Sequence, residues 1–252
     1  MIYIYPVGGL GNMLFHIAAI WSLAKDNDDN LCLLNVDRKI DTLYNNFDLK
    51  NAPKYRYIFN RFSLANGNIN NKLQYPFHYV PLEYKNEHEY VGFFQSEKYF
   101  KHRRNDILEL FKSADEFSFE INKYQNIFGN ISLHVRRKDY VGSPIFGTVG
   151  LDYYQNALLQ LPQDMQVVVF SDDLKWCREN FIGGRFLFID DNDYVVLYLM
   201  SKMKHHIIAN STFSWWGAWL SEYQDKIVIA PKVWFGTDIP YADIVPENWI
   251  KL

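Results

Sequence analysis

The chain has 252 residues, of which 48% are hydrophobic and 17% aromatic, enough for one large domain or two small ones with a substantial core. Its formal net charge of −3 and its pI near 6.2 exclude a general electrostatic attraction to nucleic acid or to an anionic membrane surface. The two cysteines, Cys32 and Cys177, are too few for a disulfide framework or a cysteine-based metal cluster. The amino terminus carries no charged region followed by a long apolar run, which predicts a soluble, cytoplasmic protein without a signal peptide or membrane anchor.

The first predicted elements form the start of a parallel α/β sheet. A short strand over residues 2–5 leads through a glycine loop, residues 7–12, into a helix over residues 13–25 with one apolar face. A second strand follows over residues 31–36. Residues 41–90 have weak periodicity and predict no clear element, after which a strand is expected over residues 90–94 and a helix that ends near Ser113.

The second half of the chain alternates more regularly between strands and helices. Strands are predicted over residues 131–135, 166–170, 185–189, 206–209 and 227–230. The helices between them are predicted over residues 152–160, 174–180, 193–203 and 211–220. This order is typical of a doubly wound parallel sheet, in which ligands bind beyond the carboxyl ends of the strands.

Four polar or glycine-rich clusters fall at such strand ends. The first is the loop with Gly9, Gly11 and Asn12, where backbone amides at a helix amino terminus can approach an anion. Leu14 stands where the dinucleotide fingerprint has its third glycine, and the lysine and hydroxyl residue of a P-loop are absent. A tight structural turn therefore explains this loop equally well.

The second cluster is the segment His134-Val135-Arg136-Arg137, at the end of a short apolar strand. Strand alternation points His134 and Arg136 to the same side and Arg137 to the other. The planar guanidinium fork matches phosphate oxygens, so Arg136 is the better candidate for holding a diphosphate, with a contribution of roughly 1.5–3 kcal/mol. Arg137 in a salt bridge that holds the loop, and His134 as a buried core residue, remain the alternatives.

The third and fourth clusters follow later strands. Ser171, Asp172 and Asp173 end an apolar strand, where the carboxylates can accept from guanine or ribose, or can simply cap the following helix. The segment from Asn210 to Ser214 places three hydroxyl groups at a helix start, which suits an anion, whereas capping needs one. Trp215, Trp216 and Trp219 are expected to pack beneath this helix end as core.

Together these motifs resemble the fucosyltransferases of glycosyltransferase family 11, chiefly the α-1,2-fucosyltransferases. The resemblance rests on GGLGN (8–12) with Phe15, GFFQS (92–96) with Tyr99 and Phe100, HVRR-x-DY (134–140), FSDD (170–173), residues 210–220, APK-x-WF (230–235) and PENW (246–249). It spans nearly the whole chain in the expected order.

This resemblance implies a GT-B-like α/β fold with two Rossmann-like halves that have parallel sheets. Residues 1–122 would form the acceptor-side half and residues 123–252 the half that binds GDP-fucose, with the tail packing back on the first. The implied reaction moves L-fucose from GDP-β-L-fucose to a glycan acceptor, most simply the 2-hydroxyl of a terminal β-galactose. It inverts the anomeric centre and needs no metal or other cofactor.

The resemblance also implies roles for individual residues. Arg136 would hold the β-phosphate and stabilise the departing GDP. Independently of the resemblance, Asp139 is the candidate general base because it lies two residues past the arginine pair, at the expected cleft; alternatively its carboxylate orients Arg136 or Arg137. The predicted donor-binding set is Gly9, Gly11, Asn12, His134, Arg136, Ser171, Asp172, Asp173, Asn210, Ser211, Thr212, Phe213 and Ser214.

Two departures from the family pattern concern the acceptor side. Met13 stands where relatives usually carry glutamine, and the chain is compact between the glycine loop and Val91. Transfer with another linkage, α-1,3 or α-1,6, or to a protein hydroxyl therefore stays open. A non-catalytic glycan- or nucleotide-binding module also stays open, although the motifs of this chain are intact. A dinucleotide-dependent oxidoreductase is disfavoured by the incomplete glycine fingerprint.

Overall fold

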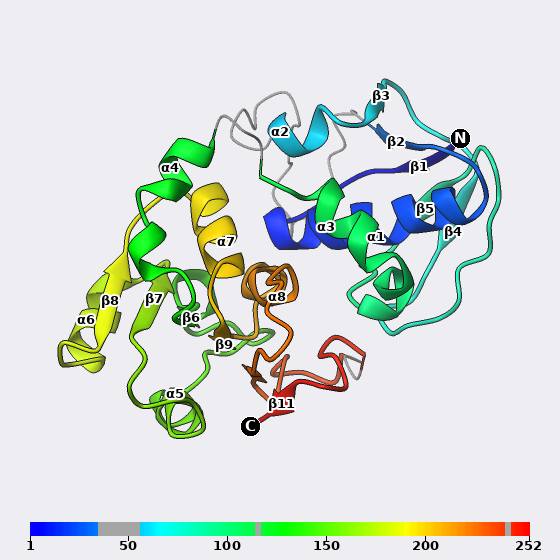
Figure 1. The fold of residues 1–252 in the computed structure, drawn as a ribbon. Coiled ribbons are helices and arrows are strands. Elements are labelled where there is room, and N and C mark those ends of the chain that lie inside the picture. Colours follow the sequence, from blue (N-terminus) through cyan, green and yellow to red (C-terminus); the bar gives the residue numbers. More distant parts are fainter. Residues whose placement is uncertain (35–55, 114–116, 240–242) are drawn as a thin grey trace. The chain divides into compact units, whose positions relative to one another are not determined.

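The computed structural model describes residues 1–34, 56–113, 117–239 and 243–252, and the chain divides into two compact units (Figure 1). The first unit comprises residues 1–112 and 240–246, and the second comprises residues 113–239 and 247–252. The division expected between residues 122 and 123 falls directly after helix α4 (Ser118–Asn122), which belongs to the second unit. No helix among the described residues is both long enough and apolar enough to cross a membrane.

The first unit is built on a parallel sheet with the strand order β3-β2-β1-β5-β4. Its elements are β1 (Ile2–Ile4), α1 (Leu10–Asp26), β2 (Leu31–Leu34), α2 (Arg56–Phe59), β3 (Ser63–Ala65), β4 (Lys72–Gln74), β5 (Glu89–Val91) and α3 (Arg104–Leu110). The strand predicted over residues 31–36 is present over Leu31–Leu34, and its last two predicted residues lie outside the described part. The strand predicted over residues 90–94 is wrong after Val91, because Phe94 adopts a φ of +53° that no strand accommodates.

The second unit is built on a parallel sheet with the order β11-β10-β9-β6-β7-β8. After α4 its elements are β6 (Ile131–Val135), α5 (Leu151–Leu158), β7 (Val167–Ser171), α6 (Leu174–Asn180), β8 (Phe186–Ile189), α7 (Asp193–Ser201), β9 (His205–Ile207), α8 (Thr212–Trp219), β10 (Val228–Ala230) and β11 (Ile250–Lys251). Strand β6 and helix α6 have the predicted bounds. Two units with parallel sheets confirm the predicted α/β class with two Rossmann-like halves.

Alternation along β6 divides the core of the second unit between the two faces of the sheet. Ile131, Leu133 and Val135 face the side covered by α5 and α6, where they pack in one apolar cluster with Tyr154 and Cys177. The intervening side chains belong to the other face, and the ring of His134 there lies 5.7 Å from that of Phe213 in α8. Burial of each large apolar side chain stabilises the unit by roughly 1.5–3 kcal/mol, so this cluster fixes the strand register that positions the polar residues after β6.

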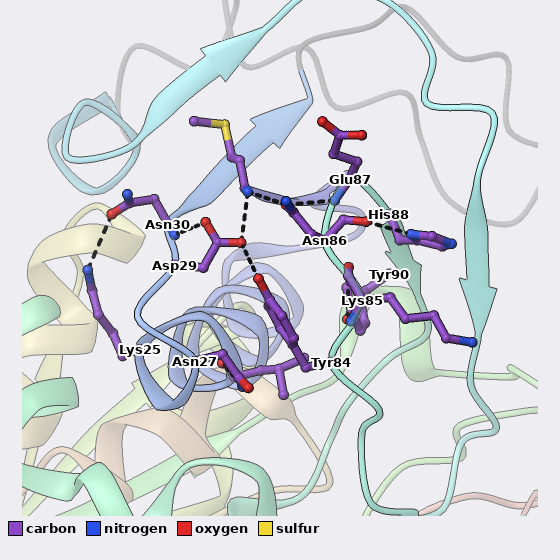
Figure 2. A network of polar contacts seen from close by, with 12 residues as sticks. Lys25, Asn27, Asp29, Asn30, Tyr84, Lys85, Asn86, Glu87, His88 and Tyr90 are labelled. Atoms are coloured by element: carbon purple, nitrogen blue, oxygen red, sulfur yellow. Dashed lines mark hydrogen bonds and ion pairs between the residues drawn. The ribbon is translucent and has the colours of Figure 1, made fainter.

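A network of polar contacts holds the amino-terminal edge of the first sheet (Figure 2). The amino group of Met1 lies 2.8 Å from a carboxylate oxygen of Asp29, and the Tyr84 hydroxyl donates to the same oxygen at 3.0 Å. Burial raises the pKa of the Asp29 carboxyl, but hydrogen bonds from the amino terminus, Asn30 and Tyr84 outweigh it and hold the pKa below its ordinary value. This edge ties β1 to the segments before β2 and β5, and leaves the opposite, carboxyl edge for a ligand.

Candidate functional site

The glycine loop lies at the carboxyl end of β1, in the first unit. Gly8 has a φ of +81°, a region that favours glycine, and Gly9 is the N-cap of α1. No side chain of the described residues caps this helix, so its first N–H groups, those of Leu10 and Gly11, face the loop. Because those N–H groups carry partial positive charge, the loop has the geometry of an anion site.

Two buried side chains support this loop from beneath. His16 accepts a hydrogen bond from the backbone N–H of Val7 at 3.3 Å, and burial lowers its pKa to about 3, so the ring is neutral at ordinary pH. The Asn12 carboxamide accepts a hydrogen bond from Gln95 Nε2 at 3.0 Å. Gly9, Gly11 and Asn12 therefore lie together at one edge of the first sheet.

In the second unit, Arg136 is held between two carboxylates. Its guanidinium lies 2.7 Å from Asp139 Oδ1 and 3.3 Å from Asp172 Oδ2, and 5.4 Å from the centre of the Tyr140 ring. About a third of the Arg136 side chain stays exposed, at 34%. The charge is thus fixed at the end of β6 and still accessible to a ligand anion. Tyr140 was not predicted as part of the site, although its position four residues after Arg136 places it in the same tight turn.

Arg137 pairs through its side chain with a different carboxylate, as strand alternation predicts. Its backbone N–H donates to Asp172 at 2.9 Å, its side chain pairs with Asp173 at 3.2 Å, and its guanidinium carbon lies 4.2 Å from the centre of the Trp176 ring. Asp173 also caps α6 by accepting from the Trp176 N–H at 3.1 Å. That hydrogen bond and then Arg137 lower the pKa of Asp173. Arg137 therefore forms the loop-holding salt bridge that was its alternative role, and Asp173 forms the helix cap.

His134 is buried beside Arg136 and α8. Burial and then the charge of Arg136 lower its pKa to about 3. The ring is therefore neutral at ordinary pH and offers a hydrogen bond, not a positive charge, to any ligand. Its Nδ1 atom has no hydrogen-bond partner within the described residues, which is unusual for a buried polar atom.

Asn210, at the carboxyl end of β9, joins the loop after β6 to the segment after β10. Its Nδ2 atom lies 2.9, 3.3 and 3.0 Å from the carbonyl oxygens of Phe146, Gly147 and Trp234. The Tyr140 hydroxyl donates to the Asn210 carbonyl at 3.3 Å. In this arrangement Asn210 organises the walls of the site instead of pointing into solvent.

A cavity of about 410 Å³ lies next to Asn210, at the carboxyl ends of β9 and β10. Its lining comes from the loop after β6, from α5 and from the segment after β10, and comprises Phe146, Gly147, Thr148, Val149, Tyr153, Asn210, Pro231, Lys232, Val233, Gly236 and Leu252. Ligand pockets in proteins are of this size and are mostly apolar with a few fixed polar groups.

The hydroxyl groups at the start of α8 differ in their hydrogen bonds and in their burial. Ser211 is the N-cap residue, yet within the described residues its side chain makes no capping hydrogen bond to α8. The Ser214 hydroxyl donates a hydrogen bond to the Ser211 carbonyl at 3.2 Å. Both serines are buried, whereas Thr212 and Phe213 are half-buried. Trp215, Trp216 and Trp219 pack beneath as core, as expected.

The structure gathers the later predicted residues at one edge of the second sheet, where the Ser171 Oγ accepts the Asp173 N–H at 2.9 Å. Among the residues that the structure describes, no group of three or more His, Cys, Asp or Glu side chains could hold a metal ion. The edge instead presents an accessible arginine, a helix amino terminus and a neutral histidine, which suits a phosphate-bearing ligand.

Comparisons with known proteins agree on one family. The sequence profile of glycosyl transferase family 11 matches residues 18–252. The O-antigen biosynthesis glycosyltransferase WbnK of Escherichia coli is 34% identical over 68% of this chain and 63% of its own length. An α-1,2-colitosyltransferase of Escherichia coli is 32% identical over 97% of this chain and 96% of its own. The galactoside α-(1,2)-fucosyltransferase 2 of Gorilla gorilla gorilla is 26% identical over 86% of this chain and 68% of its own length.

Proposed function

Because the chain belongs to glycosyl transferase family 11, we propose that it moves L-fucose from GDP-β-L-fucose to the 2-hydroxyl of a terminal β-galactose on a glycan, with inversion and without a metal ion. The relatives named as α-1,2-transferases support the linkage, and the galactoside transferase supports the acceptor class. The observation that carries the proposal is Arg136, fixed at the end of β6 by two carboxylates and still one-third exposed.

Arg136 suits a nucleoside diphosphate in both charge and geometry. The guanidinium presents parallel N–H donors that match two phosphate oxygens. In a glycosyl transfer, negative charge grows on the diphosphate as the bond to the sugar breaks, so a fixed cation there stabilises the transition state more than the ground state. The nearby N–H groups at the start of α8 add to this stabilisation.

The proposed reaction is a single displacement. The acceptor hydroxyl attacks fucose C1 from the face opposite the GDP, its proton passes to a general base, and GDP leaves with both electrons of the broken C–O bond. Asp139 is the candidate base. Its carboxylate lies 2.7 Å from Arg136 and is more than half exposed, so a role in orienting Arg136 is equally compatible with its position.

A second candidate substrate is a nucleotide-linked colitose, which the full-length similarity to the α-1,2-colitosyltransferase favours. Colitose lacks the 3-hydroxyl group of L-fucose. A site built to hydrogen-bond that hydroxyl rejects the deoxy sugar strongly, whereas an apolar contact discriminates weakly.

A matrix of donors and acceptors tests the proposal. The enzyme would be given GDP-fucose or GDP-colitose with lactose, with N-acetyllactosamine or with a galactose-free glycan, each with and without chelator. The proposal predicts chelator-insensitive product from GDP-fucose and β-galactosides, with an α-1,2 linkage by NMR. An α-1,3 or α-1,6 product would overturn the linkage, and preference for colitose would replace the donor sugar.

A further inference from the structure

The segment after β5 has an unusual backbone. A methyl group added at Gly92 would lie 3.1 Å from the Phe94 ring and 3.2 Å from Tyr75 Cβ. Phe94 itself is in the left-handed region, with a φ of +53°, although it is a bulky residue. The Ser96 N–H donates to the Phe94 carbonyl at 2.8 Å, which makes Gln95 the centre of a three-residue turn. Such conformations persist only where the surrounding structure requires them, and they cluster at functional sites.

The turn places a polar side chain where an apolar one would pack without cost. Gln95 is 5% exposed, and its Oε1 atom is buried without a hydrogen-bond partner among the described residues. Its Nε2 atom donates a hydrogen bond to Asn12 Oδ1 at 3.0 Å. A buried glutamine with half of its carboxamide unsatisfied is unfavourable for stability alone, so the contact with Asn12 is the feature to explain.

This contact fixes which end of the Asn12 carboxamide faces the glycine loop. Oδ1 is directed to Gln95, and Nδ2 lies over Gly8, only 2.6 Å from where a methyl group on that residue would be. Asn12 is half-buried and Gly9 is exposed, so the amide lies at the accessible end of the loop. Nδ2 is a donor and suits an anionic oxygen, whereas Oδ1 would repel it. Without a partner for Oδ1, the two ends of the carboxamide can exchange places.

We propose that Gln95 is a positioning residue, which holds the Asn12 carboxamide with its NH2 group toward the glycine loop so that Asn12 donates to an anionic oxygen of the nucleotide-sugar donor. This inference rests on the proposed function and on the sequence prediction that Asn12 belongs to the donor-binding set. Gln95 itself does not touch the donor and acts only through Asn12.

A double-mutant cycle tests this coupling. Gln95→Met keeps an unbranched side chain of similar size but cannot donate, and Asn12→Ala removes the group that Gln95 positions. Each single substitution is expected to raise the KM for GDP-fucose by about three- to tenfold, with the acceptor KM unchanged. In the double variant the effect should equal that of Asn12→Ala alone, because Gln95 has nothing left to position.

Ile107→Val provides the control for a loss of stability in the same unit, since Ile107 is fully buried in α3. It should lower the melting temperature and leave the KM for GDP-fucose unchanged. If Gln95→Met does not fold, the cycle is repeated with Gln95→Glu, whose carboxylate keeps the shape of the side chain but only accepts hydrogen bonds.

The outcomes separate this inference from the function on which it rests. Active wild-type enzyme with multiplicative effects of the two substitutions, or with equal changes in both KM values, would overturn the positioning role alone. Wild-type enzyme that neither binds GDP nor turns over GDP-fucose would overturn the proposed donor and this inference with it.

Discussion

Arg136 and Arg137 are neighbours in the sequence, but their guanidinium groups pair with different carboxylates. Strand alternation predicted that their side chains diverge, and the structure gives Arg136 to Asp139 and Asp172, and Arg137 to Asp173. Strand alternation was enough to predict the directions of the two side chains, because their partners follow the carboxyl ends of β6 and β7, which are paired neighbours in the sheet. Local pattern was not enough for Asn210, whose amide meets carbonyl groups 24 to 64 residues away.

The substitution Asp139→Asn separates the two candidate roles of the Asp139 carboxylate, general base and orientation of Arg136. If Asp139 is the base, turnover should fall by about 10²- to 10⁴-fold, because the amide cannot accept the proton. GDP affinity should change little, since an exposed ion pair contributes only about 0–1 kcal/mol. Steady-state kinetics and calorimetric titration with GDP measure the two quantities. Undiminished turnover with intact GDP binding would remove Asp139 as the base.

At the scale of elements, strong local signals gave the best predictions. Helix α6 begins after the Asp173 cap and β6 is an uninterrupted buried strand, and both have the predicted bounds. Strands β3 and β4 were missed because they are three residues long and largely exposed, so they carry no apolar alternation. Only pairing with β2 and β5 makes them strands.

Gly217 shows how helix packing reverses an intrinsic preference. Glycine to alanine in a helix normally stabilises by about 0.5–1 kcal/mol. Here a methyl group would lie 2.7 Å from Met200 Cβ, so α7 and α8 would have to separate. Gly217→Ala should therefore destabilise the protein by about 1–3 kcal/mol in urea unfolding. Gly184→Ala is the matched control, because nothing lies within 4 Å of its added methyl group. Equal stability of the two variants would contradict this packing.

At the scale of the whole molecule, the alternation of strands and helices predicted a doubly wound parallel sheet, and the family resemblance implied the two Rossmann-like halves. The resemblance also implied that the tail packs back on the first half, but periodicity did not indicate which residues do so: residues 243–246 belong to the first unit, where Asp243 pairs with Lys98 at 2.6 Å and accepts from the Tyr79 N–H at 3.1 Å. These contacts join residues far apart in the chain, and no local periodicity encodes them.

Buried histidines predict how the stability of both units depends on pH. His16 in the first unit and His134 in the second have a pKa lowered to about 3 by burial, whereas an unfolded histidine titrates near 6.5. The unfolded state therefore binds more protons below pH 6.5, and stability present above that pH is lost progressively as the pH falls toward 3. Each of the two histidines should lower the free energy of unfolding by roughly 2 kcal/mol between about pH 7 and about pH 5. Urea unfolding at the two pH values measures this loss, and His16→Gln should reduce it. An unchanged loss in that variant would contradict the assignment.

Arg136 is proposed to hold the diphosphate of GDP-fucose for a metal-independent transfer, and GDP release from GDP-fucose with lactose measures this role. We expect acceptor-stimulated release that a chelator does not affect and that Arg136→Ala reduces by at least about 10²-fold. An Arg136→Ala variant that retains wild-type turnover, or wild-type turnover that stops with chelator, would contradict this role of Arg136.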